Sequence, residues 1–293
     1  MTTLAAPQPA QPSNYNNING LHPCTPIVKW AGGKGRLIDQ LIKRLPPGSE
    51  GMRHVEPFAG GAALFFSRAP ERALLCDVNP SLGHAYRSVR DTVEEVIRHL
   101  RRLAKQHSTL HYYQVREKYN AARESFNAER AAMFIYLNKT CFNGLHRVNR
   151  HGEFNVPLGS YTNPRIVDEI NLTEANKRLR NVKLDCIDFR KLPSRAKPGD
   201  FLYLDPPYAP ISSTANFTSY SLSGFSWQDQ AELGDVFRAL DKRGCKLMLS
   251  NSDVPLIHQI YKGYRIERIL APRAISCKGE ARRPVPELIV RNY

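Results

Sequence analysis

The sequence lacks long hydrophobic runs, and no apolar stretch approaches the roughly 18 residues that a membrane-spanning helix needs. The N-terminal residues lack the basic start and apolar centre of a signal peptide, and their Pro, Gln, Asn and Ser content predicts a disordered tail over residues 1–26. The six cysteines form no C-x-x-C pair and no cluster with histidines, which argues against a zinc site or a disulfide framework. We therefore expect a cytoplasmic protein with reduced thiols, no membrane partner and no metal.

Acidic residues are also scarce. The chain has 27 Asp and Glu against 42 Lys and Arg, which gives a net charge of +15. Such an excess favours a polyanionic partner, because each phosphate that a cation neutralises releases counterions. The same balance fits an ordinary basic enzyme equally well. With 293 residues, of which 42% are hydrophobic, the chain can bury one α/β core and carry a smaller second module.

Short apolar runs alternate with helical stretches along most of the chain. This alternation predicts a mostly parallel, Rossmann-like α/β sheet with helices on both faces. Ligands bind such sheets at the carboxyl ends of the strands, and polar and glycine residues follow several of these runs. The expected strands cover residues 53–55, 73–76, 182–185, 201–204, 245–250, 265–270 and 288–290.

The middle of the chain has a different pattern, which indicates an inserted module over residues 91–174. Helices are expected over 93–104 and 112–122, with an amphipathic helix over 129–137 and a β-hairpin over 152–161. The sheet domain would then consist of residues 27–90 and 175–293, interrupted by this mostly helical insertion.

The most informative motif follows the apolar run at 201–204. There Asp205-Pro206-Pro207-Tyr208 brings a carboxylate, two prolines and an aromatic ring to the end of a strand. Proline fixes φ and has no backbone N–H, so the turn is rigid and its carbonyls stay free as acceptors. An amino group that is to be alkylated needs acceptors for its hydrogens, which Asp205 and the Pro206 carbonyl supply. The simpler alternative is a proline turn with a capping Asp.

With this motif the sequence resembles the Dam-type DNA adenine-N6 methyltransferases over nearly all of its expected ordered length. The motif order implies the subgroup whose recognition module lies between the glycine loop and the Asp-Pro-Pro-Tyr motif. The matching motifs are Lys29-Trp30-Ala31-Gly32-Gly33-Lys34, Glu56-Pro57-Phe58-Ala59-Gly60-Gly61, Asp77-Val78-Asn79, Phe142-Asn143-Gly144-Leu145-His146-Arg147, Gly152-Glu153-Phe154-Asn155-Val156-Pro157, Ala215-Asn216-Phe217-Thr218 and Ser250-Asn251. The chain departs from the family at Ala62, where a glycine is common.

The resemblance implies S-adenosylmethionine as the methyl donor. Phe58, Gly60 and Gly61 would form a turn that the cofactor approaches closely, because two of them lack side chains. Asp77 would contact the ribose hydroxyls. Lys34 would pair with the amino-acid end of the cofactor, and Asp188 and Phe189 would receive its adenine. The full set of cofactor residues that the resemblance implies is Trp30, Ala31, Gly32, Lys34, Glu56, Pro57, Phe58, Gly60, Gly61, Asp77, Asn79, Asp188, Phe189 and Asp205.

The resemblance also implies duplex DNA as the partner, the palindrome GATC as the target, and a monomeric enzyme. Methylation of adenine N6 inside a duplex requires the base to be flipped out, and Phe142 would fill the vacated position. Arg147 has the shape to contact guanine O6 and N7. A solvated surface charge remains the simpler interpretation of most basic residues here. The implied DNA-binding residues are Lys29, Phe142, Asn143, Leu145, Arg147, Asn155, Pro157 and Tyr161.

The implied reaction is direct transfer, in which Asp205, Pro206, Pro207 and Tyr208 hold the target base and no covalent enzyme intermediate forms. Three alternatives remain. The acceptor could be cytosine N4, an RNA adenine or a protein amide; the chain could be an inactive DNA-binding regulator; or the sheet could serve a nicotinamide-dependent dehydrogenase. The last is disfavoured because no G-x-G-x-x-G follows the first expected strand.

Overall fold

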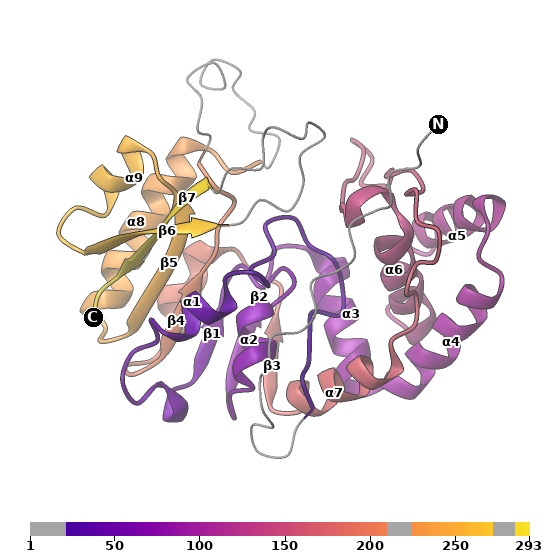
Figure 1. The fold of residues 1–293 in the computed structure, drawn as a ribbon, viewed down its shortest axis with the longest axis horizontal. Helices are drawn as coiled ribbons and strands as arrows, with labels where there is room; N and C mark the ends of the chain where they lie inside the picture. The colour runs from indigo at the N-terminus through magenta and orange to yellow at the C-terminus, as the bar shows by residue number, and fades with distance from the viewer. Residues whose placement is uncertain (1–21, 210–223, 272–284) are drawn as a thin grey trace. The chain divides into compact units, whose positions relative to one another are not determined.

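The computed structural model describes residues 22–209, 224–271 and 285–293, and these divide into two compact units (Figure 1). The sheet unit comprises Lys34–Pro80 and the described residues from Asn181 onward. The helical unit comprises the described residues up to Gly33 together with Ser81–Arg180. The inserted unit is therefore longer than the 91–174 expected from sequence, because one helix at each of its ends packs within it.

In the described residues seven strands form one sheet with the order β3-β2-β1-β4-β5-β7-β6. The first five strands in chain order run parallel, and β7 inserts antiparallel between β5 and β6. The strand order reverses between β1 and β4, which is the place where ligands bind in such sheets. The strands are β1 (His54–Glu56), β2 (Ala73–Cys76), β3 (Val182–Asp185), β4 (Phe201–Leu204), β5 (Lys246–Ser252), β6 (Arg265–Ala271) and β7 (Val285–Arg291).

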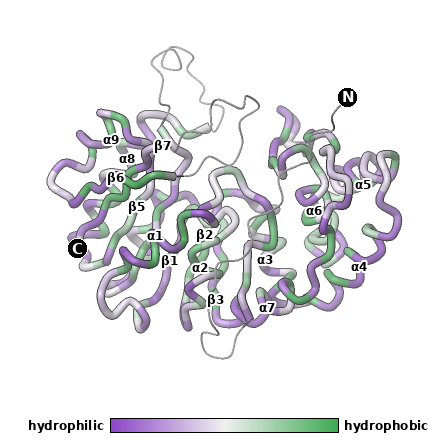
Figure 2. The backbone as a smooth tube through the Cα atoms, in the orientation of Figure 1, coloured by the Kyte–Doolittle hydropathy of each residue, from purple (hydrophilic) through white to green (hydrophobic). Residues whose placement is uncertain are grey.

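The expected Rossmann-like α/β fold is confirmed, with a largely hydrophobic sheet (Figure 2). On one face, alternate strand residues such as Val55, Leu202 and Leu249 pack in one core with α8, α9 and η3. On the other face, the Phe65 ring of α2 lies against His54. Burial on both faces explains why the strands appear in the sequence as short continuous apolar runs. The helices of the sheet unit are α1 (Ile38–Ile42), η1 (Ser49–Gly51), α2 (Ala63–Arg68), η3 (Phe189–Ser194), α8 (Trp227–Lys242) and α9 (Pro255–Ile260).

The helical unit is built around α6, which contacts both α4 and α5. The expected helices over 93–104 and 112–122 are confirmed, and Ser108 and Asn127 cap α5 and α6 by accepting backbone N–H groups of the first turn. The expectation of an amphipathic α6 is wrong. Its residues are buried nearly all round, because neighbouring helices enclose it. The elements are α3 (Pro80–Asp91), α4 (Val93–Lys105), α5 (Thr109–Ala121), α6 (Ala128–Thr140), η2 (Phe142–Gly144) and α7 (Glu169–Leu179).

Two further sequence expectations need correction. The hairpin expected over 152–161 has no regular strands in the described chain; its arms begin earlier and pair through two isolated antiparallel bridges, Cys141 to Leu158 and Val148 to Phe154. Residues 22–26, which the sequence assigned to a disordered tail, are described by the structure: Cys24 is buried, and the Thr25 backbone N–H donates to the Asn171 side chain at 2.8 Å. Residues 1–21 lie outside the described residues.

Candidate active site

The motif at residues 205–208 directly follows β4, at the carboxyl edge of the sheet. Because β4 pairs with β1, this motif and the glycine loop after β1 leave the sheet side by side at the point where the strand order reverses. Asp205, Pro206, Pro207 and Tyr208 are therefore in the position where an open α/β sheet binds its ligands.

Buried polar side chains from α8 and β5 hold this turn in place. The Gln230 amide donates to the Pro207 carbonyl at 2.9 Å and accepts from Asn251 at 2.9 Å. Asn251 in turn accepts the Ala209 N–H at 3.1 Å, and the Ser252 hydroxyl donates to the Ala209 carbonyl at 2.7 Å. Buried hydrogen bonds of this kind fix one conformation, because leaving any of these groups unpaired is costly.

Asp205 forms an ion pair with Lys34, whose Nζ lies 2.8 Å from the carboxylate. Lys34 is buried, and its Nζ also lies 4.5 Å from the centre of the Tyr208 ring. Burial raises the pKa of Asp205 to about 6, although Lys34 opposes the shift. Asp205 is thus an ionised acceptor at neutral pH, held next to the ring that follows it in the motif.

Two carbonyls of the motif differ in their hydrogen bonding. The Pro207 carbonyl accepts the Gln230 amide, whereas the Pro206 carbonyl accepts no hydrogen bond from any donor in the described chain. Asp205 and a Pro206 carbonyl that has no donor among the described residues thus offer two acceptors at the end of one strand. An amino group with two hydrogens matches this pair of acceptors.

The Tyr208 hydroxyl donates to Glu287 on β7 at 2.6 Å. Burial raises the pKa of Tyr208 well above its usual value, so the phenol keeps its proton and acts as the donor. Sequence reasoning missed Glu287 and Gln230. One part of the hydrogen-bond network around the motif did have a sequence signal. It is the polar run Ser250-Asn251-Ser252, which ends the otherwise apolar β5.

The glycine loop after β1 is joined to the end of β2 through Asp77. The Gly60 and Asn79 backbone N–H groups each donate to the Asp77 carboxylate at 2.9 Å. Burial raises the pKa of Asp77, and these two hydrogen bonds oppose the shift. Ala62, where the family commonly has glycine, adopts a left-handed conformation with φ of 51°. The backbone thus follows a glycine-type path that an alanine adopts only with strain.

Glu56 and Pro57 are buried. The Glu56 carboxyl accepts the Phe65 N–H at 2.8 Å and lies 2.7 Å from His54 Nε2. Arg68 completes this group through His54 Nδ1 at 2.6 Å. Burial raises the pKa of Glu56 to about 8. These contacts give Glu56 a structural role at the start of the loop.

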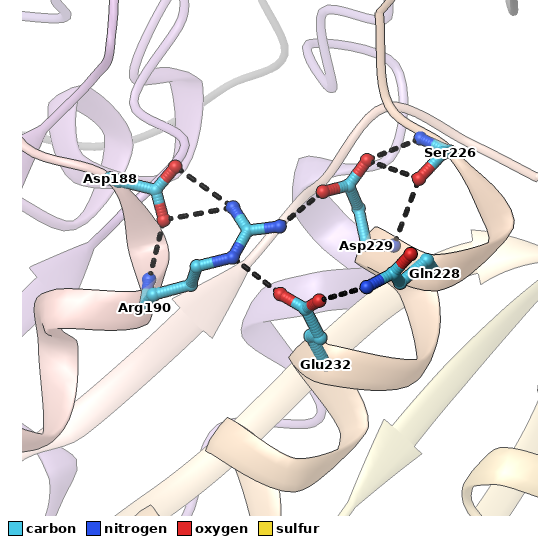
Figure 3. Close-up of polar contacts among 6 residues, drawn as sticks. All are labelled: Asp188, Arg190, Ser226, Gln228, Asp229 and Glu232. Atoms are coloured by element: carbon cyan, nitrogen blue, oxygen red, sulfur yellow. Dashed lines mark hydrogen bonds and ion pairs between the residues drawn. The ribbon is translucent and has the colours of Figure 1, made fainter.

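Asp188 and Phe189 lie at the start of η3, beyond β3. Arg190 fixes this segment: Figure 3 shows its guanidinium between Asp188, Asp229 and Glu232, and so it joins η3 to the first turns of α8. The Asp188 carboxylate accepts from the Arg190 backbone N–H at 2.8 Å as well as from the guanidinium. The ion pairs of Arg190 therefore hold η3 against the start of α8, and the capping box of Ser226 with Asp229 fixes the first turn of α8.

Three aromatic rings lie together at the start of η3. Phe58 of the glycine loop lies 5.6 Å from Phe189, and Phe225 lies 5.9 Å from Phe58 and 5.5 Å from Phe189, measured between ring centres. The structure thus brings together Phe58 and Phe189, which the sequence singled out separately, and adds Phe225, which it did not. Flat apolar rings of this kind suit a planar heterocycle.

In the helical unit the predicted residue Lys29 is bound to the end of α6. The Asn138 side chain accepts the Lys29 N–H at 2.7 Å, and it donates to the carbonyls of Lys29 at 2.8 Å and Gly144 at 3.1 Å. The Lys29 Nζ lies 3.8 Å from the centre of the Tyr161 ring. Trp30 stacks on His146 with ring centres 5.6 Å apart. Residues 29–33 of the N-terminal motif therefore lie in the unit that carries the expected DNA-binding residues, whereas Lys34 belongs to the sheet unit.

The segment after α6 exposes several apolar side chains. Phe142 is 48% exposed and Leu145 is 37% exposed. The Arg147 guanidinium is held by Asn155, whose side-chain oxygen accepts from Nε at 2.8 Å. This short segment thus carries exposed apolar side chains and a guanidinium, which are groups that can contact base edges. The other expected residues of the N-terminal and DNA-binding sets in this unit, Ala31, Gly32, Asn143 and Pro157, are also exposed, and Tyr161 is partly buried.

No helix within 22–209, 224–271 and 285–293 is long and apolar enough to cross a membrane. The same residues contain no group of three or more His, Cys, Asp or Glu side chains placed to hold a metal ion. The expected motif at 215–218 lies outside the described residues.

Comparisons with known proteins give a consistent result. A model of the D12 class N6 adenine-specific DNA methyltransferase family matches residues 30–275. The chain is 41% identical over 285 residues to the Type II methyltransferase M.MjaIII of Methanocaldococcus jannaschii, covering 92% of this chain and 99% of that protein. It is 41% identical over 273 residues to a Type II methyltransferase of Lactococcus lactis, covering 92% and 95%. It is 35% identical over 265 residues to the DNA adenine methylase of Escherichia coli, covering 90% and 93%.

Proposed function

Because the chain belongs to the D12 class of N6 adenine-specific DNA methyltransferases, we propose that it methylates adenine in GATC sites of duplex DNA, with S-adenosylmethionine as the donor. The observation that carries the proposal is the position of Asp205, Pro206 and Tyr208 at the reversal of strand order, where a carboxylate paired with Lys34 is followed by a carbonyl that accepts no hydrogen bond from the described residues. The enzyme class rests on the family, and the target, donor site and base flipping are our inference.

The residues around the carboxyl edge fit S-adenosylmethionine chemically. Asp77 is a largely buried carboxylate at a strand end, and its oxygens retain acceptor capacity for hydroxyl groups beyond the two N–H groups they bind. The ring cluster of Phe58, Phe189 and Phe225 suits an adenine ring. Lys34 supplies a buried ammonium for a carboxylate. When bound, the cofactor would supply an activated methyl group on a sulfonium centre.

The chain's own residues then handle the target base. Asp205 and the Pro206 carbonyl would accept the two hydrogens of the adenine amino group, which aims the nitrogen lone pair. Tyr208 would stack on the flat base. Asp205 need not be a strong base, because the amino nitrogen becomes acidic only as its new bond forms; its carboxylate is then the adjacent acceptor for the proton. Positioning and electrostatics are the main contribution of the protein.

Access to the amino group supports base flipping, because N6 of a stacked, paired adenine cannot reach an enclosed turn. Exposed Phe142 is the candidate for filling the vacated position in the stack. Arg147, held by Asn155, is the candidate for reading a guanine, a contact that can discriminate by roughly 1–3 kcal/mol. The net charge of +15 agrees with a phosphate-rich partner.

The test is tritium transfer from labelled S-adenosylmethionine to two short duplexes, one with GATC and one with that site scrambled. Label on adenine N6 in the GATC duplex alone supports reaction, donor and target together. Label in both duplexes would refute the target while leaving the reaction. Asp205→Ala should abolish transfer and leave DNA binding largely intact; full activity in that variant would refute the catalytic assignment.

Base flipping has a separate test. A duplex with 2-aminopurine in place of the target adenine should brighten when the protein binds, because unstacking relieves quenching. Phe142→Ala should reduce that brightening more than it reduces DNA binding. A wild-type complex with unchanged fluorescence would contradict flipping. Cofactor and DNA binding without any transfer would instead indicate the inactive regulator.

A further inference from the structure

We propose that Glu287 is a positioning residue for methyl transfer, which acts by holding the Tyr208 ring through its hydroxyl group. The inference rests on the proposed function, in which Tyr208 stacks on the target base. Glu287 lies about 80 positions after Tyr208 in the chain and outside every motif found in the sequence. Its Oε2 accepts the Tyr208 hydroxyl at 2.6 Å.

The path of β7 brings Glu287 to this place. In the sheet Glu287 lies opposite Ser252 of β5 and opposite Ile269 of β6. Its neighbour Leu288 belongs to the core that packs against α8. Because successive residues of a strand point to opposite faces, Glu287 points to the other face of the sheet, where Tyr208 meets it.

Tyr208 is thereby held at two points. The Lys34 ammonium lies against the ring, 4.5 Å from its centre, and the Glu287 carboxylate takes the hydroxyl hydrogen. Lys34 also pairs with Asp205. Two restraints on one ring fix its tilt, whereas a single contact at the ring face would let it rotate. A ring with a fixed tilt presents one surface to the base and so aligns the amino group with Asp205.

The second effect of Glu287 is electrostatic. Its negative charge acts on Asp205 and raises the pKa of that carboxyl, although burial is the larger cause. Removing the charge while keeping an acceptor should therefore lower the pH at which Asp205 becomes protonated. The charged or titratable groups that face Asp205 are Lys34, Glu56, Tyr203, Tyr208 and Glu287.

A double-mutant cycle in methyl transfer tests the inference. Glu287→Ala should lower kcat roughly tenfold, as expected for losing a hydrogen bond to a charged group in a buried site. Tyr208→Phe keeps the ring, loses the hydroxyl and should give a similar loss. The double variant should be no slower than Tyr208→Phe alone, because both changes remove the same hydrogen bond.

The conservative variant Glu287→Gln separates the two effects. Its amide oxygen still accepts the Tyr208 hydrogen, so kcat at neutral pH should stay close to wild type. The acid limb of the pH profile should move to lower pH, because one negative charge beside Asp205 is gone. Glu267→Gln is the matched control: it removes a strand carboxylate from β6 that pairs with Arg44 and Arg291, and it should leave both kcat and the acid limb unchanged.

The inference is overturned if Glu287→Ala keeps wild-type kcat, or if its loss multiplies that of Tyr208→Phe. An acid limb that stays in place in Glu287→Gln would overturn the electrostatic part. Should Glu287→Ala fail to fold, Tyr208→Phe decides, because it removes the same hydrogen bond; wild-type kcat in that variant would overturn the inference. Wild-type protein that methylates no adenine would refute the proposed function and this inference together. An active wild type whose kcat does not change in Glu287→Ala would refute this inference alone.

Discussion

Replacing Lys34 by Met should move the acid limb of methyl transfer to higher pH. Transfer requires ionised Asp205 as an acceptor, and burial raises the pKa of that carboxyl to about 6. Activity should therefore fall as pH decreases through about 6 in the wild type. Lys34, 2.8 Å away, favours the ionised form and opposes the effect of burial. Its removal leaves burial unopposed, so Asp205 should take up a proton at a higher pH.

The size of the shift follows from the geometry. A charge-assisted hydrogen bond in a buried site stabilises its charged form by about 1.5–3 kcal/mol. One pH unit corresponds to about 1.4 kcal/mol. The acid limb should therefore move by about one to two units. The Lys34 and Asp205 side chains are only 7% and 19% exposed, so solvent screens their interaction weakly.

The assay is single-turnover tritium transfer over a range of pH at saturating S-adenosylmethionine. Saturation matters because Lys34 is also proposed to bind the cofactor, and its loss should raise KM. Lys43→Met, at an exposed lysine after α1, is the matched control and should leave the limb in place. A Lys34→Met profile that is lower at every pH but has an unmoved limb would refute the electrostatic reasoning.

Three further changes have defined outcomes. Ala62→Gly should raise the free energy of unfolding by up to about 1 kcal/mol, because Ala62 has a strained φ of 51°; a loss of stability in chemical denaturation would contradict this. Gly144→Ala should weaken DNA binding in an anisotropy titration, because a Cβ there would lie 2.4 Å from the Lys29 Cβ at a φ of +62°, and wild-type affinity would be the contrary result. Arg190→Met should weaken S-adenosylmethionine binding, measured by calorimetry, and should leave the melting temperature nearly unchanged. The reason is that the change releases Asp188 from a partly exposed ion-pair network, which contributes little to stability. Equal cofactor affinity in that variant would exclude a role for the network.

The strands were the most predictable part of the fold. β3 and β4 have the bounds expected from sequence, because each is a short run between polar segments and packs into a sheet that is buried on both faces. The position of the helix α6 in the sequence was predicted correctly, but its burial was not. The pattern of its alanines and aromatic residues predicts one apolar face. In the structure α4 and α5 pack against α6, and its residues are buried nearly all round. Periodicity along one chain does not reveal how many neighbours a helix has.

In the candidate site, too, the residues themselves were predicted but not all of their contacts. The sequence identified Asp205, Lys34 and Asp77, and the structure joins the first two in an ion pair and bonds Asp77 to the glycine loop. Glu56 was assigned to the cofactor from its motif, and its carboxyl is buried against His54. The direction of a side chain depends on the strand face it occupies. The strand face that Glu56 occupies could not be predicted from β1, which is only three residues long.

The sequence by itself determined the chemistry available to this protein: the acceptors and ring of the Asp205–Pro206–Pro207–Tyr208 turn, and the order of the motifs around it. These are local properties, because a proline turn after an apolar strand takes its shape from its own residues. The tertiary structure decided which distant groups act on that turn. Gln230 and Glu287 reach it only because α8 packs on the sheet and β7 inserts beside β5. Contacts between residues so far apart depend on strand order and register, which no local pattern encodes.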